Sequence, residues 1–370
     1  MARVLKWRLG AATLSTIAAC AAAGSAFAGV PLCKPDDRVD APPNNLAWPE
    51  PLGLVDNRAD DPPGLDLVDL RGRPPGSHET LQWGDVRWRE PSIGCAWVSQ
   101  TLDFWPNPDT MHGPWPTIVY FHPNGVNSHV EPGSKIYDNV VQVALANGFN
   151  FVSVEFRHPV VDQYLAVIDP DGQVPKHDVA EAIQYLRRNA GELNISANNL
   201  FAFGFSRGSL ALWQALQPDV RGARPDAPST AVSAFVGYQA PTTFQCGQYA
   251  DLFVVDAQDA MLECEAENPA WPQFDSAIDA VTSQSVPVRL QYALGFELVW
   301  RTKNEIHKRP LHYIERFYKP EHYPDFGIAL CNRYADVGNP GCVRPIPYVD
   351  FKDQFVGWLP FVTPLLKPDF

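Results

Sequence analysis

The chain has 370 residues, of which 45% are hydrophobic and 19% are charged, so it can bury a large core in one or two domains. Its formal charge is −13, and no concentrated basic patch is visible. This charge argues against nucleic acid or an anionic membrane surface as the main partner, because both would repel the protein. No phosphate-binding glycine loop is present, so no cofactor is expected.

The N-terminus has the pattern of a secretory signal peptide, which we place at residues 1–28. Three basic residues within positions 3–8 precede an apolar run at 9–23, and Ala-Phe-Ala at 26–28 forms a small-x-small cleavage site. The apolar run is shorter than the roughly 20 residues that a bilayer-spanning helix needs. We therefore expect cleavage before Gly29 and a secreted or periplasmic protein without a membrane span.

Seven cysteines are present, one of them in the leader. Cys20 ends an Ile-Ala-Ala-Cys sequence that resembles a bacterial lipobox, so a lipid anchor at Cys20 is the alternative to simple cleavage. The other six form an even set in an oxidising compartment, which predicts three disulfides among fifteen possible pairings. Short loops favour the pairs Cys246–Cys264, Cys331–Cys342 and, by remainder, Cys33–Cys95. No C-x-x-C and no histidine pair has metal-ligand spacing, so no metal site is predicted.

The first part of the mature chain, residues 29–80, is rich in Pro, Asp and Gly and predicts a loop-rich wrap around the domain surface. Alternating polar and apolar residues at 86–89 and 97–105 predict antiparallel strands at a sheet edge. A buried strand at 117–121, a helix at 134–146 and a strand at 149–156 follow.

The helix at 178–189 has the clearest pattern in the chain, with Asp178 as its N-cap and Glu181 completing a capping box. The remaining predicted elements are a strand at 200–203, a helix at 209–216, strands at 231–238, 286–294 and 311–318, a mostly looped stretch at 324–347 and a closing helix at 349–359. Strands that alternate with helices predict an α/β fold. Its mostly parallel sheet would be flanked by helices and have an antiparallel N-terminal edge, in a domain spanning 81–370.

The most informative motif is Gly204-Phe205-Ser206-Arg207-Gly208, a G-x-S-x-G sequence between a predicted strand and a predicted helix. This context is what a nucleophile elbow requires, because glycines relieve the crowding of a sharp strand-to-helix turn. Ser206 is therefore the candidate nucleophile. A catalytic serine also needs a base and donors for the oxyanion that forms on the substrate carbonyl.

Three stretches together resemble secreted carboxylesterases of the α/β-hydrolase superfamily, of the feruloyl and acetyl esterase type. The segment 101–106, Thr-Leu-Asp-Phe-Trp-Pro, resembles the L-D-x-Y-x-P strand before their oxyanion loop, and 113–122 resembles its continuation. The segment 178–207 resembles their D-x-x-x-A-x-x-x-L-R helix and the elbow. The resemblance covers roughly residues 80–330 and implies an α/β-hydrolase fold and a serine esterase that hydrolyses carboxylic esters of small molecules or polymers.

The resemblance also points to the oxyanion donors. His122-Pro123-Asn124-Gly125 stands where the family carries an H-G-G-G-type loop. Pro123 has no amide hydrogen, so the donors would be the amides of Asn124 or Gly125 together with that of Arg207. The Arg207 side chain has two interpretations, a structural salt bridge or a contact with an acidic or polar acyl group.

The other two members of the triad follow from the family's chain order of serine, acid and histidine. Glu297 follows the strand at 286–294 and resembles the family's G-x-x-D loop, with Asp279 and Glu305 as alternatives. His322 follows the last predicted strand and is the candidate base, ahead of His307 and His312. Two other functions remain open at this point, a serine peptidase of the same fold and a non-catalytic binding protein of that fold.

Overall fold

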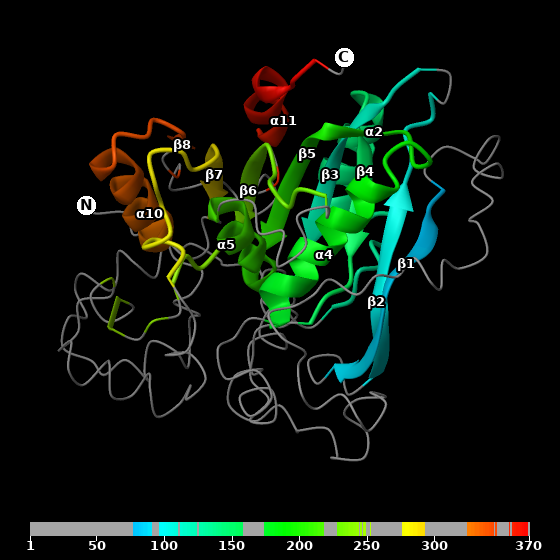
Figure 1. The fold of residues 1–370 in the computed structure, drawn as a ribbon, viewed down its shortest axis with the longest axis horizontal. Helices are drawn as coiled ribbons and strands as arrows, with labels where there is room; N and C mark the ends of the chain where they lie inside the picture. Colours follow the sequence, from blue (N-terminus) through cyan, green and yellow to red (C-terminus); the bar gives the residue numbers. More distant parts are fainter. Residues whose placement is uncertain are drawn as a thin grey trace, which may run out of the picture.

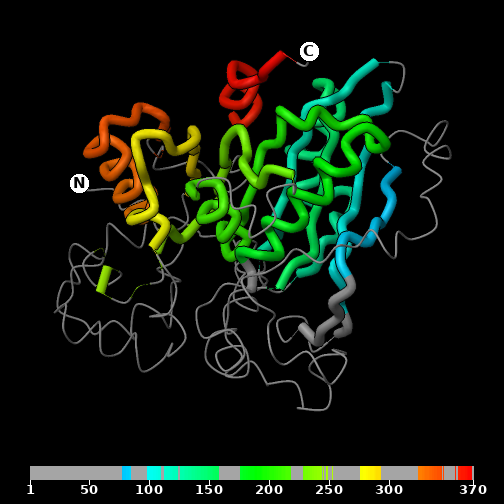
Figure 2. The backbone as a smooth tube through the Cα atoms, in the orientation of Figure 1, coloured from blue at the N-terminus to red at the C-terminus, as the bar shows by residue number. Residues whose placement is uncertain are grey.

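The structure is a computed structural model that describes residues 77–90, 96–109, 112–123, 126–157, 174–217, 228–243, 276–292, 324–343 and 357–368, with a few single positions between them. The predicted signal peptide, nearly all of the predicted wrap and the predicted strand at 311–318 lie outside these residues. Figure 1 shows the fold and Figure 2 the course of the backbone.

One sheet of eight strands forms the centre, in the order β1-β2-β4-β3-β5-β6-β7-β8. The strands are β1 (Glu79–Glu90), β2 (Ala96–Trp105), β3 (Trp115–Phe121), β4 (Asn150–Val154), β5 (Ile195–Phe205), β6 (Ala234–Tyr238), β7 (Val288–Gln291) and β8 (Cys342–Val343). β2 pairs antiparallel with β1 and β4, and all later pairings are parallel. The predicted mostly parallel sheet with an antiparallel N-terminal edge is confirmed, and the fold is that of the α/β-hydrolases.

Alternate residues of the central strands enter two separate hydrophobic cores. In β5, Leu200 and Ala202 belong to one core, whereas Phe201 and Phe203 belong to the other. All four are buried. A strand that is apolar on both faces needs cover on both faces, which is why this segment reads as a continuous apolar run in the sequence.

Helices supply that cover. Residues of α4 (Val174–Arg188), α5 (Leu210–Leu216) and α10 (Pro324–Asp336) line the first core. The second core is closed by a π-helical turn (η7, Tyr137–Val141), α2 (Gln142–Ala146) and α11 (Trp358–Val362), which lie across the opposite face (Figure 1). Two short 3₁₀ turns, η8 (Ser206–Ser209) and η13 (Thr363–Leu365), precede α5 and follow α11.

The predicted N-cap at Asp178 is wrong, because α4 begins four residues earlier at Val174. Asp178 is fully buried inside the helix, and its carboxylate accepts hydrogen bonds from Arg157 and Gln100. The predicted apolar stripe of this helix is confirmed, since Val179 and Ile183 are both fully buried.

The predicted loop at 324–347 is also wrong in its first half, which forms α10, and a short strand, β8, follows it. Pro324 is the first residue of α10, a position where the missing amide hydrogen costs nothing, and Asp325 complements the helix dipole in the first turn. Phe326, Leu330 and Tyr334 recur every four residues and are fully buried.

The closing helix is shorter and later than the predicted 349–359. α11 begins at Trp358, directly after Gly357, whose φ of 85° lies in the left-handed region. Phe355 and Trp358 are buried against the second core, as predicted for the apolar side of this segment, whereas Phe351 lies outside the described residues.

Within the described part of the chain, no helix has the length and hydropathy required to cross a bilayer.

Candidate active site

Ser206 stands at the turn between β5 and the helical unit that continues into α5. Its backbone has a φ of 51°, a left-handed conformation that a residue with a Cβ rarely adopts. Phe205 before it is still extended, and the 3₁₀ turn η8 begins at Ser206 itself. The strained serine between a parallel strand and a helix is the geometry of a nucleophile elbow, and Ser206 is partly exposed there.

The two glycines of the motif are required by close backbone contacts. A Cβ on Gly204 would lie 2.5 Å from the carbonyl oxygen of Gly208, on the other side of the turn. A Cβ on Gly208 would lie 1.9 Å from the carbonyl oxygen of Phe121, the last residue of β3. The elbow is therefore pressed against the end of β3, where the predicted oxyanion segment begins.

The segment after β3 is anchored by a buried histidine and a buried glutamate. Nε2 of His122 lies 3.1 Å from Oε1 of Glu155, and Oε2 of Glu155 accepts a hydrogen bond of 2.8 Å from the amide of Ser128. Nδ1 of His122 lies 3.0 Å from the carbonyl oxygen of Pro123. Both ring nitrogens thus lie within hydrogen-bond distance of an acceptor oxygen. Glu155 in this way holds the two ends of the segment that contains residues 124 and 125.

The sequence places His122 at the start of the candidate oxyanion loop but does not reveal its partner Glu155. Glu155 directly follows β4, in Val154-Glu155-Phe156-Arg157, where charged residues interrupt an apolar run. Both Glu155 and Arg157 are buried. Charged residues directly after a buried parallel strand lie at the carboxyl edge of the sheet, where such sheets carry their functional side chains. The charged residues in this position could have identified Glu155 from the sequence.

Arg157 joins the carboxyl end of β4 to α4. Its Nε and Nη2 atoms donate to the two carboxylate oxygens of Asp178 over 2.9 and 2.5 Å, and its amide donates to the same group over 2.8 Å. The side-chain amide of Gln100, in β2, donates a fourth hydrogen bond to this carboxylate, over 3.0 Å. Asp178 is therefore a structural anchor that fixes α4 behind the elbow.

The Arg207 side chain is buried, with 5% of its surface exposed. Its amide belongs to the first turn after the nucleophile, where helix-start amides point toward the end of the preceding strand. Of the predicted oxyanion donors, Arg207 is described, whereas Asn124 and Gly125 lie outside the described residues.

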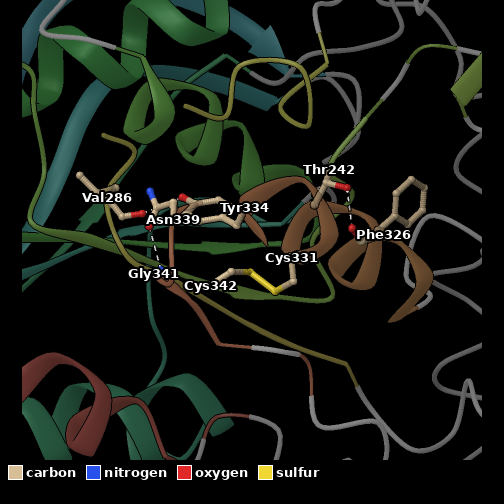
Figure 3. The surroundings of a disulfide bond; sticks show 8 residues. All are labelled: Thr242, Val286, Phe326, Cys331, Tyr334, Asn339, Gly341 and Cys342. Atoms are coloured by element: carbon tan, nitrogen blue, oxygen red, sulfur yellow. Dashed lines mark hydrogen bonds between the residues drawn. A yellow bond between two sulfur atoms is a disulfide. The ribbon is translucent and has the colours of Figure 1, made fainter. Parts of the chain in front are cut away.

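The start of α10 lies at the same edge of the sheet as Ser206. The hydroxyl of Thr242, shortly after β6, donates to the carbonyl oxygen of Phe326 over 2.9 Å. Tyr292, directly after β7, packs so closely on Gly327 that a Cβ there would lie 2.8 Å from its ring. Figure 3 shows the contact between Thr242 and Phe326. Because both contacts come from residues that follow parallel strands, the first turn of α10 is held at the carboxyl edge.

A disulfide between Cys331 and Cys342 joins the middle of α10 to β8, as predicted (Figure 3). The hydroxyl of Tyr334 on the same helix donates to the carbonyl oxygen of Val286, over 2.7 Å, just before β7. Both contacts fix α10 to the far edge of the sheet. The other predicted pairs, Cys33–Cys95 and Cys246–Cys264, lie outside the described residues, as does Cys20.

The predicted acid and base, Glu297 and His322, lie outside the described residues, together with Glu305, His307 and His312. The remaining alternative acid, Asp279, is described. It is exposed, comes nine positions before β7, and accepts a hydrogen bond of 2.8 Å from Gln248.

A search of curated proteins finds no match to this chain, whereas solved structures and one family profile do match it. Among solved structures, a truncated carbohydrate esterase from gut microbiota has a TM-score of 0.48 at 14% identity, over 78% of this chain and 96% of that one. An esterase from Thermogutta terrifontis with bound propionate has a TM-score of 0.45 at 14% identity, over 75% and 84% of the two chains. An acetyl ester-xyloside bifunctional hydrolase from Caldicellulosiruptor lactoaceticus has a TM-score of 0.45 at 16% identity, over 72% and 89%.

The BD-FAE family profile matches residues 102–293. The matched region starts in β2, runs through the His122 segment and the Ser206 elbow, and ends just after β7. The chain therefore belongs to the BD-FAE family and is a carboxylic ester hydrolase with the α/β-hydrolase fold.

Proposed function

We propose that this protein is a serine esterase that cleaves carboxylic esters through an acyl-enzyme on Ser206, with His322 as base and Glu297 as the acid that orients it. The observation that carries the proposal is the left-handed backbone of Ser206, whose φ is 51°. Backbone strain of this kind persists only where surrounding contacts enforce it, and the glycines on both sides of Ser206, Gly204 and Gly208, stand in close backbone contacts that admit no Cβ.

The start of α10 supports His322 as the base. His322 is two residues before Pro324, and two residues span at most about 7 Å of chain. Since the first turn of α10 contacts Thr242 and Tyr292 at the carboxyl edge, the chain enters the helix from the side on which Ser206 stands. The position of Glu297 in the sequence, six residues after the end of β7, supports its role as the acid of the triad.

The reaction then follows from these roles. The Ser206 oxygen bonds to the ester carbonyl carbon while His322 takes its proton, and the amides of Arg207 and of Asn124 or Gly125 donate to the resulting oxyanion. When the intermediate collapses, the carbon–oxygen bond to the alcohol breaks and His322 returns the proton to the leaving alcohol. Water repeats the sequence on the acyl-enzyme, which releases the carboxylic acid and restores the serine. Glu297 stabilises the protonated imidazole throughout.

Labelling with a serine-directed fluorophosphonate tests the nucleophile. Wild type should be labelled at a single site, and Ser206→Ala should not be labelled. Ser209→Ala is the matched control, because Ser209 belongs to the same turn but is fully buried and faces the carbonyl oxygen of Pro241 at 3.3 Å. Labelling that persists in Ser206→Ala would refute the assignment.

Hydrolysis of short p-nitrophenyl esters, measured beside a peptide panel, tests the reaction class and the other two residues. We expect turnover of the esters and not of the peptides. His322→Ala and Glu297→Ala should each lower kcat by orders of magnitude with little change in folding. Full activity of Glu297→Ala would transfer the acid role to Asp279 or Glu305.

We also propose that the protein is exported and that residues 1–28 are removed. The basic, apolar and small-x-small regions of this segment support the proposal, as does the disulfide between Cys331 and Cys342, since disulfides persist in oxidising compartments. Mass spectrometry of the mature N-terminus distinguishes cleavage before Gly29 from lipidation at Cys20. An unprocessed N-terminus in the cytosolic fraction would contradict export.

A further inference from the structure

Two histidines and an aspartate meet at the antiparallel edge of the sheet, away from the elbow. His78 precedes β1, Asp103 belongs to β2, and His129 lies on the segment after β3. Their candidate ligand atoms all lie within 4.8 Å of one another. The three residues are 25 and 26 positions apart in sequence, which is why no motif of short spacing predicted them.

The distances are close to those of a bound transition-metal ion. Nδ1 of His129 lies 3.3 Å from Oδ2 of Asp103, and Nε2 of His78 lies 4.0 Å from the same oxygen. Tetrahedral zinc, with bonds of about 2.0–2.2 Å, separates its ligand atoms by about 3.3–3.5 Å. The distance from His129 to Asp103 already has this length. A shift of His78 is needed to shorten its 4.0 Å distance to Asp103 and its distance to His129, which is below 4.8 Å. His78 has 31% of its side chain exposed and precedes the first strand, so it has room for that shift.

The charge of Asp103 also favours a cation. Its side chain is only 4% exposed, and in the described part of the chain the basic groups facing it within 4.0 Å are His78 and His129. Neutral imidazoles leave one buried negative charge, which is costly unless it is paired or coordinated to a metal. A divalent cation held by two neutral imidazoles and this carboxylate compensates the charge.

The surroundings have the form of an outer shell of a metal site. The second oxygen of Asp103 accepts a hydrogen bond of 2.6 Å from the Thr80 hydroxyl. Nε2 of His129, the nitrogen that does not face Asp103, lies 3.4 Å from Oε1 of Glu131. The ring of His78 stacks on Trp105 with 4.6 Å between centroids. Ligating histidines commonly donate their second N–H to a carboxylate, which fixes the tautomer that binds the metal.

We propose that His78, Asp103 and His129 form a zinc site. Two imidazoles and one carboxylate suit zinc and its neighbours in the first transition row, whereas calcium and magnesium prefer sites made of oxygen atoms. The fourth position is open to water.

The site is separate from ester cleavage. In the sheet order, β4 and β3 stand between β2 and β5, so three strand spacings of about 4.8 Å place Asp103 about 14 Å from the strand that carries Ser206. The ion would join the residue before β1, the C-terminal part of β2 and the segment 126–130. In the same segment, the amide of Ser128 donates a hydrogen bond to Glu155. Zinc would therefore stiffen the far end of the predicted oxyanion loop.

Zinc binding to the purified full chain, stripped with chelator, tests the proposal by calorimetry, elemental analysis and thermal melting. We expect one equivalent of zinc and a raised melting temperature, with calcium at the same concentration having no effect. His78→Gln and His129→Gln should each weaken binding by about 100-fold or more, and Glu131→Gln by about 10-fold. All three side chains are partly exposed, at 31%, 40% and 73%, so these variants should fold.

His112→Gln is the matched control. His112 also faces a carboxylate, with 2.7 Å between Nδ1 and Oδ2 of Asp109, but it is exposed and pairs with a single acid outside the cluster. This variant should bind zinc like wild type. The proposal is overturned if stripped wild type binds no zinc at millimolar concentration, or if binding survives unchanged in both His78→Gln and His129→Gln.

Discussion

Gly208 rests directly on the carbonyl oxygen of Phe121, so closely that a single added methyl group would lie 1.9 Å from that oxygen. This contact joins the elbow at the end of β5 to the end of β3, the strand beside it in the sheet. The turn that carries the nucleophile and the start of the loop predicted to hold the oxyanion are therefore in direct backbone contact, and only glycine permits this contact.

Gly208→Ala should therefore damage the enzyme more than any ordinary glycine substitution. The neighbour is backbone in the middle of the sheet and cannot rotate away, so we expect a loss of about 1–3 kcal/mol in the free energy of unfolding and a fall in kcat. Gly191→Ala is the control, since nothing lies within 4 Å of the added atom there. Urea denaturation and ester turnover measure the two effects. Equal behaviour of the two variants would show that the elbow can move away from β3.

Strong local periodicity made most of the fold predictable. The parallel strands read as apolar runs because both faces are covered, and the stripe of α4 is visible because Val179, Ile183 and Leu186 all enter one core. The elbow was predictable for a similar reason: Gly204 and Gly208 are fixed by contacts within a few residues or with the adjacent strand.

Features that depend on distant partners could not be predicted. Asp178 looked like an N-cap because capping rules consider only neighbours three residues away, whereas its partner Arg157 is 21 residues away. α10 was missed because Pro324 and Gly327 suggest a loop, yet a proline is acceptable in the first turn and this glycine makes room for Tyr292. The cluster of His78, Asp103 and His129 is assembled only when β1 and β2 pair.

Asp178→Asn should destabilise the protein strongly. The change keeps the shape of the side chain but removes the charge that Arg157 meets through two side-chain hydrogen bonds in a buried place. Removal of one member of a buried pair typically costs about 3–5 kcal/mol, because the other charge stays buried. Urea denaturation measures the loss. Asp279→Asn, at an exposed aspartate, should change stability by less than about 0.5 kcal/mol.

Loss of the disulfide should lower stability and, if His322 is the base, activity as well. The bridge closes a loop of 11 residues between α10 and β8, for which the chain-entropy relation gives roughly 3 kcal/mol. The paired variant Cys331→Ser with Cys342→Ser should show this loss in urea denaturation under oxidising conditions. Ester turnover at low denaturant should fall through kcat rather than KM, because the start of α10 is held less firmly. A stability unchanged by the double substitution would mean that Tyr334 and Thr242 are sufficient to fix the helix.

Two half-buried groups on α4, His177 and Glu181, should give opposite pH dependences of stability. Burial lowers the pKa of His177 from 6.5 to about 4; the charge of Asp178 opposes this shift and that of Arg157 adds to it. The contribution of His177 is therefore fully present above pH 6.5 and is lost as the pH falls toward 4. Burial raises the pKa of Glu181 from 4.5 to about 7, with the charge of Asp178 acting in the same direction. The contribution of Glu181 is fully present below pH 4.5 and is lost as the pH rises toward 7.

Between pH 4.5 and 6.5 the two contributions change in opposite directions, so together they should leave the stability of wild type nearly level in that window. Single variants should reveal the two slopes. Relative to wild type, Glu181→Gln should gain stability as the pH rises through the window, because it lacks the carboxyl group that is deprotonated at a cost in the fold. His177→Gln should lose stability relative to wild type over the same interval. Only wild type has an imidazole at this position, and its deprotonation with rising pH stabilises the fold. Urea midpoints at half-unit pH steps measure both, and difference curves with the same sign would contradict the opposing burial effects.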